Sequence, residues 1–86
     1  MNHELKTWPF YFDEVLLGLK PFEYRENDRG FQPGHTLRLR EWNPDRKEYT
    51  GRNIHLLITK FWNSIPGLPE NYCIMAIRFL RFWEDT

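Results

Sequence analysis

The sequence has one cysteine, no excess of either charge and no long apolar run, and each absence excludes a class of protein. Cys73 is the only cysteine among 86 residues, and twelve Lys and Arg balance twelve Asp and Glu. A single cysteine excludes an internal disulfide and a cysteine-rich zinc site, and favours a reducing compartment. Zero net charge leaves no overall field that would draw the molecule to a polyanion, so any nucleic-acid site has to be a local patch.

No stretch approaches the roughly 20 apolar residues that a membrane-spanning helix needs. The first residues, Met1-Asn2-His3-Glu4, also lack the basic and apolar regions of a signal peptide. We therefore expect a soluble, cytoplasmic protein without a membrane partner.

Aromatic residues are plentiful. Four Trp, four Tyr and seven Phe are present, and each ring can bury on the order of 150–250 Å² of surface. Such residues make a compact core possible in a short chain, and we expect residues 1–86 to form one domain.

One segment has the periodicity of an amphipathic helix. Pro9 suits the first helical position. Gly18 can adopt the left-handed conformation that ends a helix, and Pro21 prevents its continuation. The apolar residues Phe12, Val15, Leu16 and Leu19 follow the i, i+3, i+4, i+7 spacing of a buried helical face.

The remaining segments predict strands and turns. Strands are expected at 3–8, 22–25, 36–42, from about 49 to 62, and at 72–77 with a possible continuation to 83, and residues 84–86 are expected to fray. Residues 43–48 have the composition of a hairpin loop, and 63–71 contain two prolines and a glycine without helix or strand pattern. This order predicts an α+β, mainly β domain: a small, mostly antiparallel β-barrel with one principal helix near the N-terminus.

The alternation within these strands predicts which residues enter the core. Leu37 and Leu39 should be buried while Arg38 and Arg40 face water. In the next strand Ile54, Leu56 and Ile58 share one face.

The segment from Gly18 to Arg25 combines the end of the helix with the start of a strand. Successive side chains of a strand point to opposite faces, so we expect Phe22 and Tyr24 to enter the core. Glu23 and Arg25 would then share the other surface, with Lys20 at its mouth. This arrangement suits a binding cleft, and it also suits a solvated strand edge.

Several motifs resemble a known family. They are His3-Glu4-Leu5-Lys6-Thr7-Trp8-Pro9, Gly18-x-Lys20-x-Phe22-Glu23-x-Arg25-x-Asn27-Asp28-Arg29, Phe31-Gln32-x-Gly34, Leu39-x-Glu41-Trp42 and Tyr49-Thr50-Gly51-Arg52. Together they resemble a family of small uncharacterised bacterial and phage proteins that is grouped with the ASCH domains of the PUA-like superfamily. The match covers roughly residues 3–60 and the strand at 72–77.

The resemblance implies a PUA-like β-barrel with a cleft between barrel and helix, where the signature lysine and the charged strand residues lie. For ASCH domains in general it implies RNA or nucleotide-like ligands, with a few members acting as small hydrolases or nucleases. One hydrolytic branch has a threonine three residues after the signature lysine. Glu23 occupies that position here, so the nucleophile of that branch is absent.

Four charged residues are the first candidates for ligand binding. Arg25 offers a fork of donors that matches phosphate, Lys20 a point charge, and Glu23 an acceptor for an exocyclic amine. Arg29 could join them from the turn that follows. The alternative is that these residues form ordinary surface pairs and a tight turn.

Three further candidates lie elsewhere. Lys6 and Thr7 could supply donors near the helix N-terminus, or they could form the entry and cap of the helix. Trp42 is the preferred aromatic for stacking on a base, ahead of Trp8 and Trp62, although packing in or around the core is the alternative.

Other charged and reactive residues carry weaker signals. Arg38, Arg40, Arg52 and Lys60 could form a basic stripe, or simply the solvated face of a sheet. His3, His35 and His55 lie far apart in the sequence without metal-ligand spacing, so no metal or other cofactor is expected. Cys73 should be buried and unreactive, and no catalytic residues are assigned.

The functional expectation is a non-enzymatic module that binds RNA or a nucleotide-like ligand. One alternative is a small hydrolase of a modified nucleoside or RNA, with Lys20 as base or charge stabiliser and Glu23 as its partner. A second is a protein-interaction module. We expect a monomer or a weak homodimer, because the apolar segment 78–83 could pack on its own barrel or pair with another chain.

Overall fold

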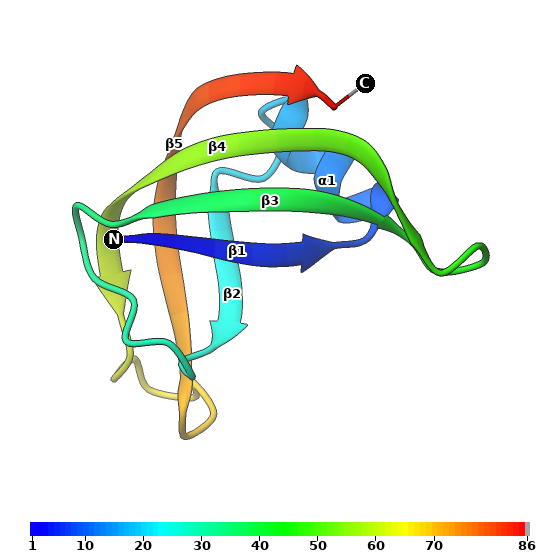
Figure 1. Ribbon diagram of the computed structural model, residues 1–86. Coiled ribbons are helices and arrows are strands. Elements are labelled where there is room, and N and C mark those ends of the chain that lie inside the picture. The colour runs from blue at the N-terminus through cyan, green and yellow to red at the C-terminus, as the bar shows by residue number, and fades with distance from the viewer. Residues whose placement is uncertain (86) are drawn as a thin grey trace.

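A computed structural model describes residues 1–85 as a strongly curled five-stranded sheet with one short helix (Figure 1). The elements are β1 (Asn2–Thr7), α1 (Pro9–Leu16), β2 (Phe22–Glu26), β3 (Thr36–Asn43), β4 (Glu48–Trp62) and β5 (Tyr72–Glu84). The expected α+β, mainly β class with a helix near the N-terminus is confirmed.

The strand order is β1-β3-β4-β5-β2, so β1 and β2 are the two edges of the sheet. β1 and β3 are parallel, and the other neighbouring pairs are antiparallel. The prediction of a mostly antiparallel sheet is confirmed, and β1 is its parallel exception. Parallel strands require a long crossover, which α1, β2 and the loop before β3 supply together.

The curl of the sheet comes from its two longest strands. The pairing of β4 with β5 shifts register between His55 and Leu56 and again between Ile58 and Lys60. Such bulges bend a strand and increase its twist. β5 pairs with β4 from Ile74 to Glu84, and its first residues, Tyr72 to Ala76, also pair with β2 on the other side (Figure 1).

The core lies inside the curl. It contains the predicted residues of β3 and β4, namely Leu37, Leu39, Ile54, Leu56 and Ile58, with Phe12 and Val15 of α1 packed among them. The prediction that Leu19 belongs to this face is wrong, because Leu19 is 71% exposed. α1 ends at Leu16 and Gly18 has a positive φ of 76°, so Leu19 no longer follows helical spacing.

The predicted hairpin loop is present, whereas the predicted fraying after residue 83 is not found for the two residues that follow. The loop between β3 and β4 is confirmed, and the Asn43 side-chain oxygen accepts hydrogen bonds from the main-chain N–H groups of Asp45 and Arg46. Segment 78–83 pairs with β4 as part of β5. The expected fraying is wrong for Glu84, the last residue of β5, and for Asp85; Thr86 lies outside the described residues.

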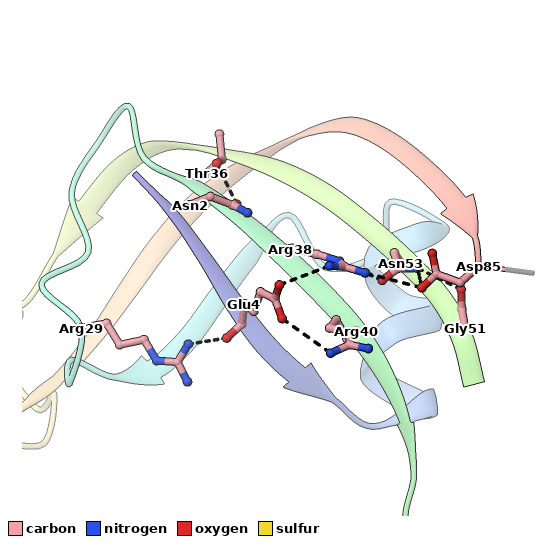
Figure 2. Close-up of polar contacts among 9 residues, drawn as sticks. All are labelled: Asn2, Glu4, Arg29, Thr36, Arg38, Arg40, Gly51, Asn53 and Asp85. Atoms are coloured by element: carbon pink, nitrogen blue, oxygen red, sulfur yellow. Dashed lines mark hydrogen bonds and ion pairs between the residues drawn. The ribbon is translucent and has the colours of Figure 1, made fainter. Parts of the chain in front are cut away.

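Asp85 is held by three contacts to the sheet. Its N–H donates to the Gly51 carbonyl at 2.7 Å, and its carboxylate accepts from Asn53 at 3.1 Å and from Arg38 at 3.5 Å (Figure 2). These long-range partners tie the end of the chain to β3 and β4.

Candidate functional site

Arginine side chains bridge the gap between the two edges of the sheet. Arg25 of β2 donates from Nη2 to the Lys6 carbonyl and to the Thr7 hydroxyl of β1, both at 3.3 Å. Arg29, in the loop after β2, donates to the Glu4 carbonyl (Figure 2). Side chains rather than a strand ladder therefore connect β1 to β2.

Glu23 lies at the centre of this arrangement and is 1% exposed. Its Oε1 accepts from Lys20 Nζ at 3.4 Å, and its Oε2 accepts from Arg25 Nε at 3.0 Å. A buried carboxylate is tolerated when it is paired and hydrogen-bonded in this way. Because Lys20 and Arg25 each engage one carboxylate oxygen, Glu23 positions both cations.

The prediction that Phe22 and Tyr24 enter the core is wrong. They are 42% and 45% exposed, and Glu23 between them is buried. The alternation itself was correct, but a period of two leaves open which face is buried. The two cations that neutralise Glu23 allow the charged position to point inward.

A pocket of about 480 Å³ lies between the start of α1 and β2, next to the ion pairs of Glu23. Its lining comprises Lys6, Thr7, Trp8, Tyr11, Lys20, Phe22, Glu23, Tyr24 and Arg25. The four aromatic side chains among them are between 42% and 53% exposed. The pocket thus combines ionised groups with aromatic surface that is open to solvent.

The pocket has an excess of positive charge. Lys6, Lys20 and Arg25 carry three positive charges, and Glu23 carries one negative charge, which leaves a formal net charge of +2 among the lining residues. Lys20 Nζ lies 5.2 Å from the centre of the Tyr11 ring. The site is therefore suited to an anion that also presents an aromatic or apolar surface.

Five of the seven predicted ligand-binding residues line this pocket: Lys6, Thr7, Lys20, Glu23 and Arg25. Thr7 is buried, donates to the Leu5 carbonyl at 3.4 Å and accepts from Arg25. The N-cap of α1 is Trp8, without a side-chain cap bond. The alternative in which Thr7 caps the helix is therefore wrong.

Arg29 and Trp42 are not among the lining residues. Besides its bond to Glu4, Arg29 pairs with Asp28 at 3.8 Å. Trp42 is half-buried on β3, with Lys6 Nζ 4.0 Å from the centre of its ring and Tyr49 packed edge-on at 4.9 Å. Trp42 therefore contacts one lining residue, Lys6, whereas Arg29 contacts residues outside the lining.

The aromatic residues of the lining were largely missed from sequence. Trp8 was only a secondary candidate for stacking, and Tyr11, Phe22 and Tyr24 were not proposed as ligand contacts. A signal was present for two of them, since Trp8 and Tyr11 are three residues apart and share one face at the start of the helix. Phe22 and Tyr24 could be found only once the buried face of β2 was known.

The arginines of the expected basic stripe form ion pairs on the sheet. Arg38 contacts Glu4 at 3.2 Å and Asp85 at 3.5 Å, and Arg40 contacts Glu4 at 3.6 Å (Figure 2). On the next strand, Arg52 contacts Asp13 at 2.9 Å and Glu41 at 3.5 Å. These pairs favour the alternative of an ordinary solvated sheet face, on which the arginines are paired with carboxylates.

Two histidines that are distant in sequence meet in the fold. His3 Nε2 lies 3.0 Å from His35 Nδ1, and His3 also packs against Phe31. The pairing of β1 with β3 brings them together. Burial, reinforced by the nearby charges of His35 and Arg29, lowers the pKa of His3.

Within residues 1–85, no three His, Cys, Asp or Glu side chains gather as a metal site would require.

Cys73 is fully buried on β5, and burial raises the pKa of its thiol. The prediction of a buried cysteine is confirmed.

In the part of the chain that is described, no helix has both the length and the apolar character needed to cross a membrane.

Comparison with known proteins gives two matches. The model of a family described as "Domain of unknown function (DUF3850)" matches residues 2–77. An Escherichia phage P2 protein, described as "Uncharacterized 12.9 kDa protein in GpA 3'region", is 44% identical over 73 residues, which are 85% of this chain. The match spans 64% of the length of that relative. The expected similarity to small phage proteins is confirmed, and the ASCH and PUA-like grouping stays a prediction.

Proposed function

This chain belongs to the DUF3850 family of domains of unknown function, and we propose that it is an ASCH-like, PUA-like module that binds a nucleotide-like ligand in the pocket between α1 and β2. The ligand is either a free nucleotide or a nucleotide of an RNA. Binding, without chemical conversion of the ligand, is the proposed activity.

One observation carries this proposal: the pocket places an excess of cations against exposed aromatic rings. A nucleotide has the matching two parts, because its phosphate is an anion and its base has a flat face that stacks on aromatic side chains. A pocket of about 480 Å³ also falls within the range of small-ligand sites, roughly 300–1,000 Å³.

The residues divide into two roles. Lys6, Lys20 and Arg25 contact the phosphate. Arg25 does so through Nη1 and its charge, because its Nε and Nη2 donate to Glu23, Lys6 and Thr7. The rings of Trp8, Tyr11, Phe22 and Tyr24 offer the stacking surface. Glu23 has both carboxylate oxygens engaged, so it acts as a positioning residue for Lys20 and Arg25 and does not read the base edge.

The test is a binding titration with labelled single-stranded RNA, double-stranded RNA and free nucleotides, at low and at physiological salt. Wild type is compared with Lys20→Ala and with Lys60→Ala, which removes an exposed lysine of β4 outside the pocket lining. A hydrogen bond to a charged group contributes about 1.5–3 kcal/mol. Lys20→Ala should therefore weaken binding by about tenfold or more, while Lys60→Ala leaves it unchanged.

Circular dichroism and thermal melting of both variants establish that they are folded. Equal affinity of the wild type and Lys20→Ala would show that the ligand does not bind in this pocket. Absence of binding to all three ligand classes would refute the proposal and favour a protein partner. Conversion of a ligand that is lost in Lys20→Ala would replace the binding role with a hydrolytic one.

A further inference from the structure

The positive charge of this protein is distributed unevenly between the pocket and the sheet. On the sheet, Arg38, Arg40 and Arg52 are paired with Glu4, Asp85, Asp13 and Glu41 at 2.9–3.6 Å. The lining of the pocket holds three cations and one carboxylate, and only Lys20 and Arg25 pair with that carboxylate. The pocket lining therefore keeps a formal excess of positive charge that these three paired arginines lack. Lys60, Arg78 and Arg81, which also have no ion pair among residues 1–85, lie on β4 and β5 outside the lining.

The segments that lead away from the pocket do not continue its positive charge. β2 runs from Arg25 into the exposed Glu26, and the exposed Asp28 follows, with Arg29 paired to it at 3.8 Å. On the other side, Lys20 is preceded by Leu17 and Leu19, each 71% exposed. A nucleic-acid chain is held by cations that follow successive phosphates, and neither of these exits offers such a series.

We infer that the pocket takes a free nucleoside monophosphate, bound through its terminal phosphate monoester, in preference to a nucleotide within an RNA chain. This inference rests on the proposed function and specifies the ligand of the same pocket. The phosphate of a monoester carries about −1.5 to −2 charges at pH 7, because its second pKa is about 6. That charge matches the formal excess of +2 in the lining.

A phosphodiester inside an RNA chain carries a single negative charge, so it neutralises only half of this excess. Its neighbouring phosphates would meet the exposed Glu26 and the Asp28–Arg29 pair, which has no net charge, on one side, or the exposed leucines on the other. The aromatic rings do not select a base by themselves, since every base presents a flat face for stacking. The phosphate end of the ligand is therefore what the pocket distinguishes.

The experiment compares ligands that share one base and differ in their phosphate. Isothermal titration at pH 7.5 uses adenosine, adenosine monophosphate, its methyl ester and an adenosine hexanucleotide with or without a 5′-phosphate. We expect the monophosphate to bind at least tenfold more tightly than adenosine, the methyl ester and the hexanucleotide without a 5′-phosphate, because these lack the monoester. It should also bind more tightly than the 5′-phosphorylated hexanucleotide, whose further phosphates find no series of cations. Its affinity should fall as the pH is lowered through about 6, because the phosphate then gains a proton.

Lys6→Gln is the variant that tests the charge match directly. Lys6 Nζ lies 4.0 Å from the centre of the Trp42 ring, and no ion pair joins Lys6 to a carboxylate among residues 1–85. Its replacement therefore leaves the ion pairs of Glu23 with Lys20 and Arg25 intact. The variant lowers the formal excess in the pocket to +1, and the preference for the monophosphate over its methyl ester should shrink at least threefold. Lys60→Gln should keep the full preference.

The outcomes separate this inference from the proposed function. Equal binding of the monophosphate and its methyl ester would overturn the inference, and so would tighter binding of either hexanucleotide, while nucleotide binding itself would stand. Absence of binding by all five ligands would refute the proposed function as well.

Discussion

Replacement of Arg25 by alanine tests the ion-pair cluster that supports the pocket. Arg25 contacts Glu23 at 3.0 Å and donates to Lys6 and Thr7 at 3.3 Å. Loss of one partner of a buried pair costs about 3–5 kcal/mol. Lys20 still contacts Glu23 at 3.4 Å, and the Arg25 side chain is 29% exposed. We therefore expect a loss of about 3 kcal/mol in the free energy of unfolding.

A double-mutant cycle isolates the contribution of the pair itself. Glu23→Gln removes the buried charge and leaves the two cations with access to water, so it should cost only about 1 kcal/mol. The double variant should cost about 2 kcal/mol, because Arg25→Ala no longer leaves an under-compensated carboxylate. The coupling energy between Arg25 and Glu23 is then about 2 kcal/mol.

Urea unfolding followed by tryptophan fluorescence measures these values, with an unchanged m-value as the condition for comparing them. A domain of ordinary stability, about 5–15 kcal/mol, remains folded in all three variants. Arg46→Ala is the control, because Arg46 pairs with Glu48 but is 74% exposed, and it should cost less than about 0.5 kcal/mol. A coupling energy below about 0.5 kcal/mol would refute the idea that Arg25 stabilises a buried Glu23.

Two further predictions concern the histidine pair and the core. Burial lowers the pKa of His3 below its ordinary 6.5, so the unfolded chain binds the proton more readily. The free energy of unfolding should therefore fall as the pH decreases below about 6.5. This loss should be smaller in His3→Gln and the same as in the wild type in His55→Gln. An equal dependence of the free energy of unfolding on pH in all three proteins would contradict the prediction. Leu39→Ala should lower the free energy of unfolding by about 2–5 kcal/mol, whereas Leu19→Ala should change it by less than about 0.5 kcal/mol, and similar losses for both leucines would show that the assigned core is wrong.

Most of the secondary structure could be predicted because its causes are local. Pro9 and Gly18 mark the region of the helix, and alternation placed Leu37 and Leu39 in the core. Lys20, Glu23 and Arg25 were also recognised together, since they fall within six residues around one turn. Periodicity, turn chemistry and short spacing are properties of neighbouring residues and do not depend on the rest of the fold.

The tertiary structure decided which face of β2 is buried, and with it the composition of the pocket. Glu23 can point inward because Lys20 and Arg25 neutralise it, and Arg25 also reaches β1, nearly twenty residues earlier in the chain. The meeting of His3 with His35 likewise depends on the parallel pairing of β1 with β3. Local patterns were enough to predict the strands, the helix and most of the charged candidates. Only the tertiary structure assembled them into a pocket, because contacts between distant segments depend on strand order and register, which local patterns do not contain.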